Sequence, residues 1–176
     1  LVNIMAAHES QLAKAIRIDR NRMNRYCRTV DPKFLEGVNR KKPRTMEELE
    51  DLWYQTQNAD GNRYTHYNSS RYRVCNLHSF FHGHHTIEFR LFQFDCPHDG
   101  KQNGMHAGRV KSFIQLCLAI NQLAKMVRTA SPKPQQTENE KYAMRCWMLR
   151  LGFIGDEFKT AREYYLNNME GNSAWR

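Results

Sequence analysis

The fold is decided by residues 72–94, which read YRVCNLHSFFHGHHTIEFRLFQF. Residues 72–81 and 86–94 are rich in aromatic and other strand-forming side chains, and the polar segment 82–85 separates them. Two such runs joined by a short glycine-containing loop predict an antiparallel hairpin. In the second run apolar and polar side chains alternate, so a strand would send one set to each face. One face would carry Ile87, Phe89 and Leu91, and the other Glu88 and Arg90.

Helical patterns flank this hairpin on both sides. Apolar spacing and N-cap residues predict helices at 2–18, from 32, at 45–57, at 106–128, at 138–151 and at 157–169. Helices, then a hairpin, then helices are typical of an α+β fold, and 176 residues suit a single domain. Apolar residues cover most of the surface of helix 106–128, so we expect it to be central and to cover the apolar face of the hairpin.

The parity of the hairpin loop decides which side chains meet across the strands. A loop with an odd number of residues (an odd loop) pairs His78 with Glu88 and Asn76 with Arg90. An even loop instead pairs Leu77 with Arg90, which leaves an apolar side chain beside the arginine. We predict the odd loop, because it gathers four polar side chains on one face.

Composition narrows the class of protein. The 27 Lys and Arg residues outnumber the 18 Asp and Glu residues, giving a net charge of +9. Such an excess of positive charge is typical of a protein that binds nucleic acid, and equally of one with a pocket for ATP and carboxylates. The longest apolar run, 116–120, falls far short of the roughly 20 residues of a membrane helix. The five cysteines form no CxxC pair, so we expect a reducing, cytoplasmic compartment.

Glu88 is the one acidic residue between Asp60 and Asp95. A lone carboxylate in an aromatic strand costs free energy unless a cation or a donor satisfies it. Two interpretations stay open. The first is a structural ion pair with Arg90. The second is a carboxylate that holds Mg²⁺ beside a guanidinium that clamps phosphate or carboxylate oxygens.

Histidines gather around the hairpin, with six of the eight between residues 75 and 106. A zinc site with Cys96 and His98 as ligands is one interpretation, but no CxxC, HxxxH or HExxH spacing supports it. We favour loop histidines, with one or two of them near a phosphate site. On a strand, His78 would share its face with Asn76.

Two motifs, RYRVCNLHS at 71–79 and TIEFRLF at 86–92, resemble the amidoligase family. These carboxylate–amine ligases are related to glutamine synthetase and glutamate–cysteine ligase and occur largely in bacteria, phages and mobile elements. Residues 1–7, 151–158 and 170–175 are also similar to the family. The resemblance implies a glutamine-synthetase-like catalytic domain whose antiparallel sheet binds ATP and a divalent metal. We expect residues 1–176 to be the C-terminal portion of a longer amidoligase domain, with the family's acidic first strand upstream.

The resemblance also implies a reaction. ATP would phosphorylate a carboxylate, and an amine would attack the acyl phosphate to form a peptide or isopeptide bond. Glu88 matches the family's Mg²⁺-binding carboxylate, and Arg90 its phosphate or substrate arginine. By the same resemblance, Arg71, Asn76 and Arg90 would contact ATP, and Arg90 and His78 would act in catalysis. The partners would be small-molecule or peptide carboxylates and amines.

Two other classes of protein remain open. A basic nucleic-acid-binding module would use the arginines of residues 17–28 with Tyr26, the basic run at 40–42, and stacking tyrosines at 64, 67 and 72. No RRM, KH or helix-turn-helix pattern supports that class. The other class is a non-catalytic interaction protein of a phage or mobile element.

Overall fold

The computed structural model describes residues 1–56, 62–94 and 106–174. Within these ranges the chain combines helices with a small antiparallel two-stranded sheet, which confirms the α+β prediction. The α-helices are α1 Val2–Ala15, α2 Arg20–Arg25, α3 Pro32–Lys41, α4 Met46–Thr56, α5 His78–Phe81, α6 Ala107–Met126, α7 Glu140–Arg150 and α8 Lys159–Asn167. The remaining elements are the 3₁₀ turns η1 Ser69–Arg71 and η2 Asp156–Phe158 and the strands β1 Cys75–Asn76 and β2 Glu88–Phe89.

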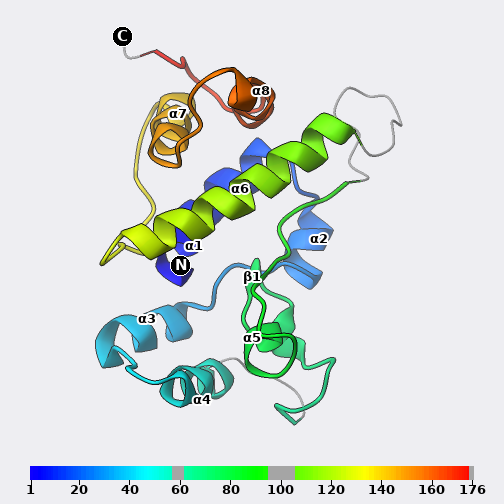
Figure 1. Cartoon of the computed structure of the whole chain (residues 1–176), viewed down its shortest axis with the longest axis vertical. Coiled ribbons are helices and arrows are strands. Elements are labelled where there is room, and N and C mark those ends of the chain that lie inside the picture. The colour runs from blue at the N-terminus through cyan, green and yellow to red at the C-terminus, as the bar shows by residue number, and fades with distance from the viewer. Residues whose placement is uncertain (57–61, 95–105, 175–176) are drawn as a thin grey trace.

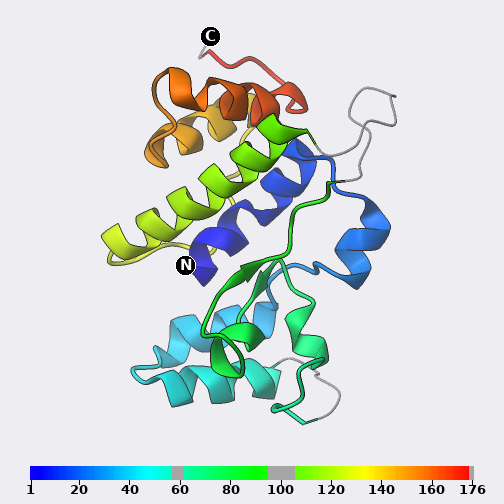
Figure 2. The same cartoon turned by 45° about the vertical axis from the view of Figure 1, so that its right-hand side comes forward.

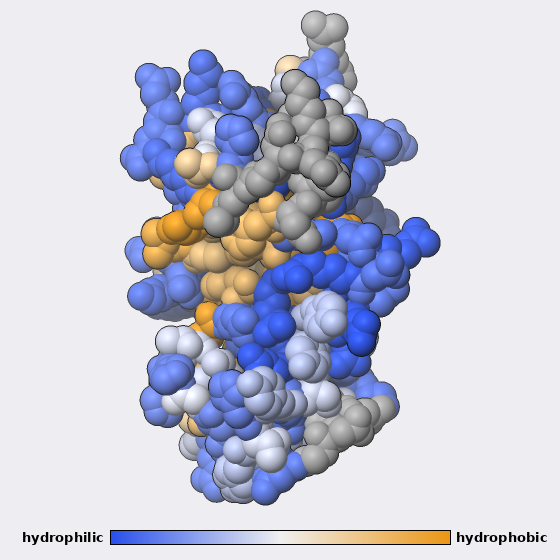
Figure 3. Space-filling view, turned by 90° about the vertical axis from the view of Figure 1, so that its right-hand side faces the viewer, coloured by the Kyte–Doolittle hydropathy of each residue, from blue (hydrophilic) through white to orange (hydrophobic). Residues whose placement is uncertain are grey.

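The elements lie in two groups with the sheet between them (Figures 1 and 2). Helices α1 and α6 run side by side across the middle, and α7 and α8 lie at the end that carries the C-terminus. Helices α3 and α4 pack on each other at the opposite end, near α5. Apolar surface gathers across the middle of the molecule, at the level of α1 and α6 (Figure 3).

Helix starts follow the sequence signals closely. Helix α3 begins after Asp31, whose Oδ1 accepts from the N–H groups of Lys33 (2.9 Å) and Phe34 (3.2 Å). Before α4, the N–H of Glu48 donates to Thr45 Oγ1 (3.1 Å), and the N–H of Thr45 donates back to Glu48 Oε2 (3.4 Å). Both arrangements satisfy amide groups that a helix leaves unpaired at its first turn.

The hairpin is much shorter than predicted. Its strands have two residues each, and residues 78–81 form helix α5 where a strand was predicted. The predicted register was also wrong, because Asn76 lies opposite Glu88 and the N–H of Arg90 donates to the carbonyl of Val74 (3.0 Å). The pairing is displaced by two residues from the odd-loop register, so parity is kept and Asn76 still shares a face with Glu88.

The cause is a local hydrogen bond that competes with the strand. The N–H of His78 donates to Asn76 Oδ1 (2.8 Å), which turns the backbone directly after β1. Asparagine side chains often replace ladder bonds in this way. His78 therefore lies at the start of α5 and not across from Glu88.

Helix α6 lies across the middle of the molecule but is only partly covered. It buries Phe113, Leu116 and Ile120, but Ile114 is 55% exposed and Leu118 is 64% exposed. Its main packing partner is α8. The helix predicted to be central thus lies in the middle of the molecule, but the side that carries Ile114 and Leu118 faces solvent.

The apolar face of the hairpin does reach the core. Leu91 is fully buried, and Ile87 and Phe89 pack partly buried against the core. The residue after Leu91 contacts α6. The ring of Phe92 stacks on that of Phe113, a residue of α6, with 4.2 Å between the ring centroids.

Two compositional predictions can be compared with the described part of the chain. None of the helices described there is both long and apolar enough to cross a membrane. The thiols of Cys27, Cys75, Cys117 and Cys146 are free. Cys96 and His98, the pair considered for zinc, lie outside the described residues.

Helix α1 carries a buried carboxylate, that of Glu9. Glu9 is 7% exposed, and its Oε2 accepts the N–H of Val30 at 2.9 Å. Burial raises the pKa of Glu9 to about 7, although this hydrogen bond and the nearby charge of Arg73 oppose the rise. Arg73 itself donates to Asp31 Oδ2 (2.9 Å). Glu9 thus lies beside an ion pair without being part of it.

We predict a pH-dependent stability difference between the protein and Glu9→Gln. A raised pKa means that the folded protein keeps a proton that the unfolded chain releases, so stability falls as the pH rises from about 4.5 to about 7. Glutamine still accepts from Val30 and avoids that loss. Denaturant unfolding should show the variant gaining roughly 1–3 kcal/mol relative to the parent between pH 5 and pH 8. The exposed Glu47→Gln serves as control, and an equal difference at both pH values would contradict the assignment.

Candidate active site

Glu88 and Arg90 form an ion pair on the polar face of the hairpin. Arg90 Nη1 donates to both carboxylate oxygens, at 3.0 Å and 3.1 Å. Arg90 is also held from the other side, because its Nε donates to the carbonyl of Tyr26 (3.1 Å) and its guanidinium lies 5.3 Å from the ring centroid of Tyr72. The Arg90 side chain is 16% exposed and that of Glu88 42%, so solvent or a ligand can reach the carboxylate.

Asn76 connects this ion pair to helix α5. Its Nδ2 donates to Glu88 Oε2 (2.8 Å), and its Oδ1 accepts the N–H of His78 (2.8 Å). Asn76 is 1% exposed, so both ends of the amide are satisfied away from bulk water. Since Glu88 accepts from two different side chains, the orientation of its carboxylate is fixed.

His78 is buried, and its protonation follows from its partners. Nε2 lies 3.0 Å from the carbonyl oxygen of Thr65, which can only accept, so Nε2 carries the hydrogen. Nδ1 must then accept from the hydroxyl of Tyr54 at 2.5 Å. Burial lowers the pKa of His78 and raises the pKa of Tyr54, which favours a neutral ring and a protonated hydroxyl.

Arg71 lies near this cluster but points elsewhere. Its charge contributes to the lowered pKa of His78. Its Nη1 donates to the carbonyl of His66 (3.1 Å), and its guanidinium lies 5.5 Å from the ring centroid of Tyr67. The structure therefore joins Asn76, His78, Glu88 and Arg90 in one hydrogen-bonded network and leaves Arg71 beside it.

A second set of polar side chains adjoins the network and was not predicted. His82 Nε2 lies 2.8 Å from Glu50 Oε1, and Arg63 Nη1 lies 3.4 Å from the same oxygen and 2.7 Å from Asp51 Oδ1. The ring of Tyr54 lies 5.7 Å from that of His82. Glu50 and Tyr54 are four residues apart on α4, so helical spacing alone places them on one face. Nothing in the sequence says that this face meets His78.

The network can be compared with what Mg²⁺ and ATP, which the resemblance implies, would need from the protein. Among the residues in the described ranges, no group of three or more His, Cys, Asp or Glu side chains is placed to hold a metal ion. Glu88 offers a half-exposed carboxylate whose oxygens keep lone pairs beyond those used by Arg90 and Asn76. Mg²⁺ that accompanies a nucleotide commonly uses one or two carboxylates, with phosphates and water as the other ligands. Glu88 therefore fits as one protein ligand of such an ion.

Comparison with known proteins identifies the family. Residues 1–121 match the family described as "Putative amidoligase enzyme", and the chain belongs to that family. The matched range includes the whole network from Tyr54 to Arg90. No curated protein and no solved structure matches the chain. The similarity of residues 151–158 and 170–175 lies beyond the matched range and stays a prediction.

We predict that Asn76→Ala destabilises the protein by about 1–3 kcal/mol, because it leaves the buried N–H of His78 without its acceptor. Denaturant unfolding measures the change. Asn24→Ala, at an exposed position of α2, is the matched control and should be close to neutral. A loss below about 0.5 kcal/mol for Asn76→Ala would show that the network contributes little to the fold.

Proposed function

We propose that this protein is part of an ATP-dependent carboxylate–amine ligase that forms an amide through an acyl phosphate. Membership of the amidoligase family supports the reaction class. The observation that carries the proposal is the oriented, half-exposed carboxylate of Glu88, held by Arg90 and Asn76.

Each member of the network has a proposed role. Glu88 would hold the divalent ion that accompanies ATP, and a bound nucleotide would supply the phosphoryl group that activates the substrate carboxylate. Arg90 presents a fixed positive charge beside Glu88, where it favours an approaching phosphate or carboxylate oxygen. Asn76 keeps the Glu88 carboxylate in one orientation, so that little reorganisation accompanies binding.

His78 and Arg71 have less direct roles in this proposal. Both ring nitrogens of His78 face protein atoms, so His78 serves as a positioning residue that holds Asn76 through its backbone N–H. Arg71 adds positive potential near the network and binds ATP phosphates only if its side chain leaves His66. The substrates are small-molecule or peptide carboxylates and amines, and the compartment is the cytoplasm.

The nucleic-acid alternative has some support in the surface. Tyr64 is 71% exposed and Tyr67 76%, and Arg71 lies over Tyr67. One arginine of the basic cluster is used internally, because Arg22 Nη2 donates to the carbonyls of Arg90 (3.2 Å) and Phe92 (2.8 Å). That arginine supports the hairpin. We therefore favour the ligase.

The test is Glu88→Gln in the intact protein that contains this sequence. Glutamine keeps the volume and removes the charge that would hold the ion, so amine-dependent release of ADP or AMP from ATP should disappear. Hydroxylamine as the amine traps an acyl phosphate as a hydroxamate, with a panel of amino acids and peptides as carboxylates. Because the side chain is half exposed, the variant should lose less than about 1 kcal/mol, and its Tm should change by less than about 3 °C.

The exposed Glu163→Gln on α8 is the matched control and should keep full turnover. A large fall in the Tm of Glu88→Gln, with activity retained in the folded fraction, would identify a structural partner of Arg90 and refute the proposed role. Absence of turnover in the parent, together with nucleic-acid binding that weakens steeply with salt, would favour the basic binding module.

A further inference from the structure

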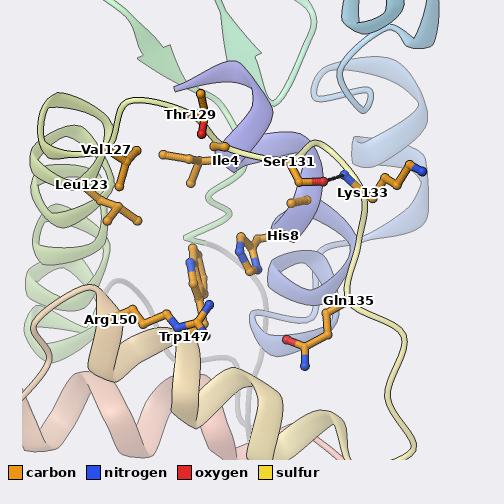
Figure 4. Close-up of a pocket in the computed structure, with 12 residues that line it drawn as sticks. Ile4, His8, Leu123, Val127, Thr129, Ser131, Lys133, Gln135, Trp147 and Arg150 are labelled. Atoms are coloured by element: carbon orange, nitrogen blue, oxygen red, sulfur yellow. Dashed lines mark hydrogen bonds between the residues drawn. The ribbon is translucent and has the colours of Figure 1, made fainter. Parts of the chain in front are cut away.

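A pocket separate from the Glu88 network adjoins helix α1. Its volume is about 320 Å³, near the lower limit of small-molecule sites. Helix α1, the C-terminal end of α6, the segment 129–135 and α7 surround it (Figure 4). None of its lining residues belongs to the network of the candidate active site.

The walls combine apolar side chains with polar ones from the segment 129–135. Ile4, Leu123 and Val127 lie around one end of the pocket in Figure 4. At the other end the imidazole of His8 stacks on the indole of Trp147, with 3.9 Å between ring centroids and 15° between the planes. Trp147 is 5% exposed, so the aromatic pair is held by the core. Such walls suit a flat apolar body.

The charge of the pocket is positive. Arg150 and Lys133 line it, and no Asp or Glu does so among the described residues. In the ranges that the structure describes, neither cation has an ion-pair partner. Figure 4 shows the ammonium of Lys133 turned outward at the rim, whereas Arg150, although exposed, lies beside Trp147. Burial lowers the pKa of His8, and the charge of Arg150 lowers it further, which keeps the imidazole neutral.

We propose that this pocket binds a small organic anion with a flat apolar body, whose carboxylate or phosphate group pairs with Arg150 while its body lies among Ile4, Leu123, Val127 and Trp147. A guanidinium suits either anion, because its planar donors match both carboxylate and phosphate oxygens. The proposal is independent of the ligase activity.

Three probes test the proposal in the intact protein by titration calorimetry. Indole-3-acetate and phenyl phosphate represent the two anion types, and indole-3-acetamide is the neutral counterpart of the first. We expect saturable binding of at least one anion, and at least tenfold weaker binding of the amide than of indole-3-acetate if the carboxylate binds. The indole N–H resonance of Trp147, assigned through Trp147→Phe, should shift on binding of that anion.

Binding to variants shows whether the anion occupies the pocket beside Arg150. Arg150→Gln should weaken binding at least tenfold, and Arg145→Gln, on the same helix outside the pocket, should change it less than twofold. Glu88→Gln should leave binding unchanged, which separates this test from that of the ligase. Failure of both anions to bind, equal binding of acid and amide, or equal weakening by the two arginine variants would overturn the proposal. If indole-3-acetate binds, its comparison with the amide needs no variant and tests the role of the charge even if Arg150→Gln fails to fold. If only phenyl phosphate binds, the shift of the Trp147 indole N–H decides whether it occupies this pocket.

Discussion

The side-chain amide of Asn76 is the contact on which the candidate active site depends. A ladder of two residues per strand supplies few backbone hydrogen bonds, so side chains must hold the hairpin in register. Asn76 does this by donating to Glu88 across the strands and accepting from His78 at the start of α5. Through these two bonds, the network extends from Tyr54 on α4 to Arg90, the residue that follows β2. Arg90 in turn donates to the carbonyl of Tyr26, the residue that follows α2.

The carboxylates of Glu9 and Glu88 differ in their surroundings, and this difference indicates which of them can bind a ligand. Glu9 is buried with one backbone donor, and its raised pKa shows that the fold tolerates its charge poorly. Glu88 has two side-chain donors, a neighbouring cation and access to solvent. A group that must meet a ligand needs both fixed orientation and access. Glu88 combines the two, and Glu9 has no access.

The sequence predicted most of the helices, since capping residues such as Asp31 and Thr45 act within one turn. It also indicated that Asn76, Glu88 and Arg90 share a face, because side-chain parity on a strand survives a shift of two residues. It missed the short helix α2, where the composition is polar. It also missed α5 and the true register, because a single bond from His78 to Asn76 overrides a strand-forming composition. The contact of Tyr54 with His78 depends on how α4 packs, and no local pattern carries that information.

The proposed role of Glu88 is tested most directly by locating where a metal–nucleotide complex binds to the protein. Mn²⁺ can replace Mg²⁺ with a non-hydrolysable ATP analogue, and its unpaired electrons broaden the NMR signals of nearby nuclei. If Glu88 holds the ion, the side-chain amide of Asn76 and the backbone signals of Glu88 broaden first, while the indole of Trp147 stays sharp. Broadening centred on Trp147 or on the arginines of α2, with Asn76 and Glu88 unaffected, would contradict that role.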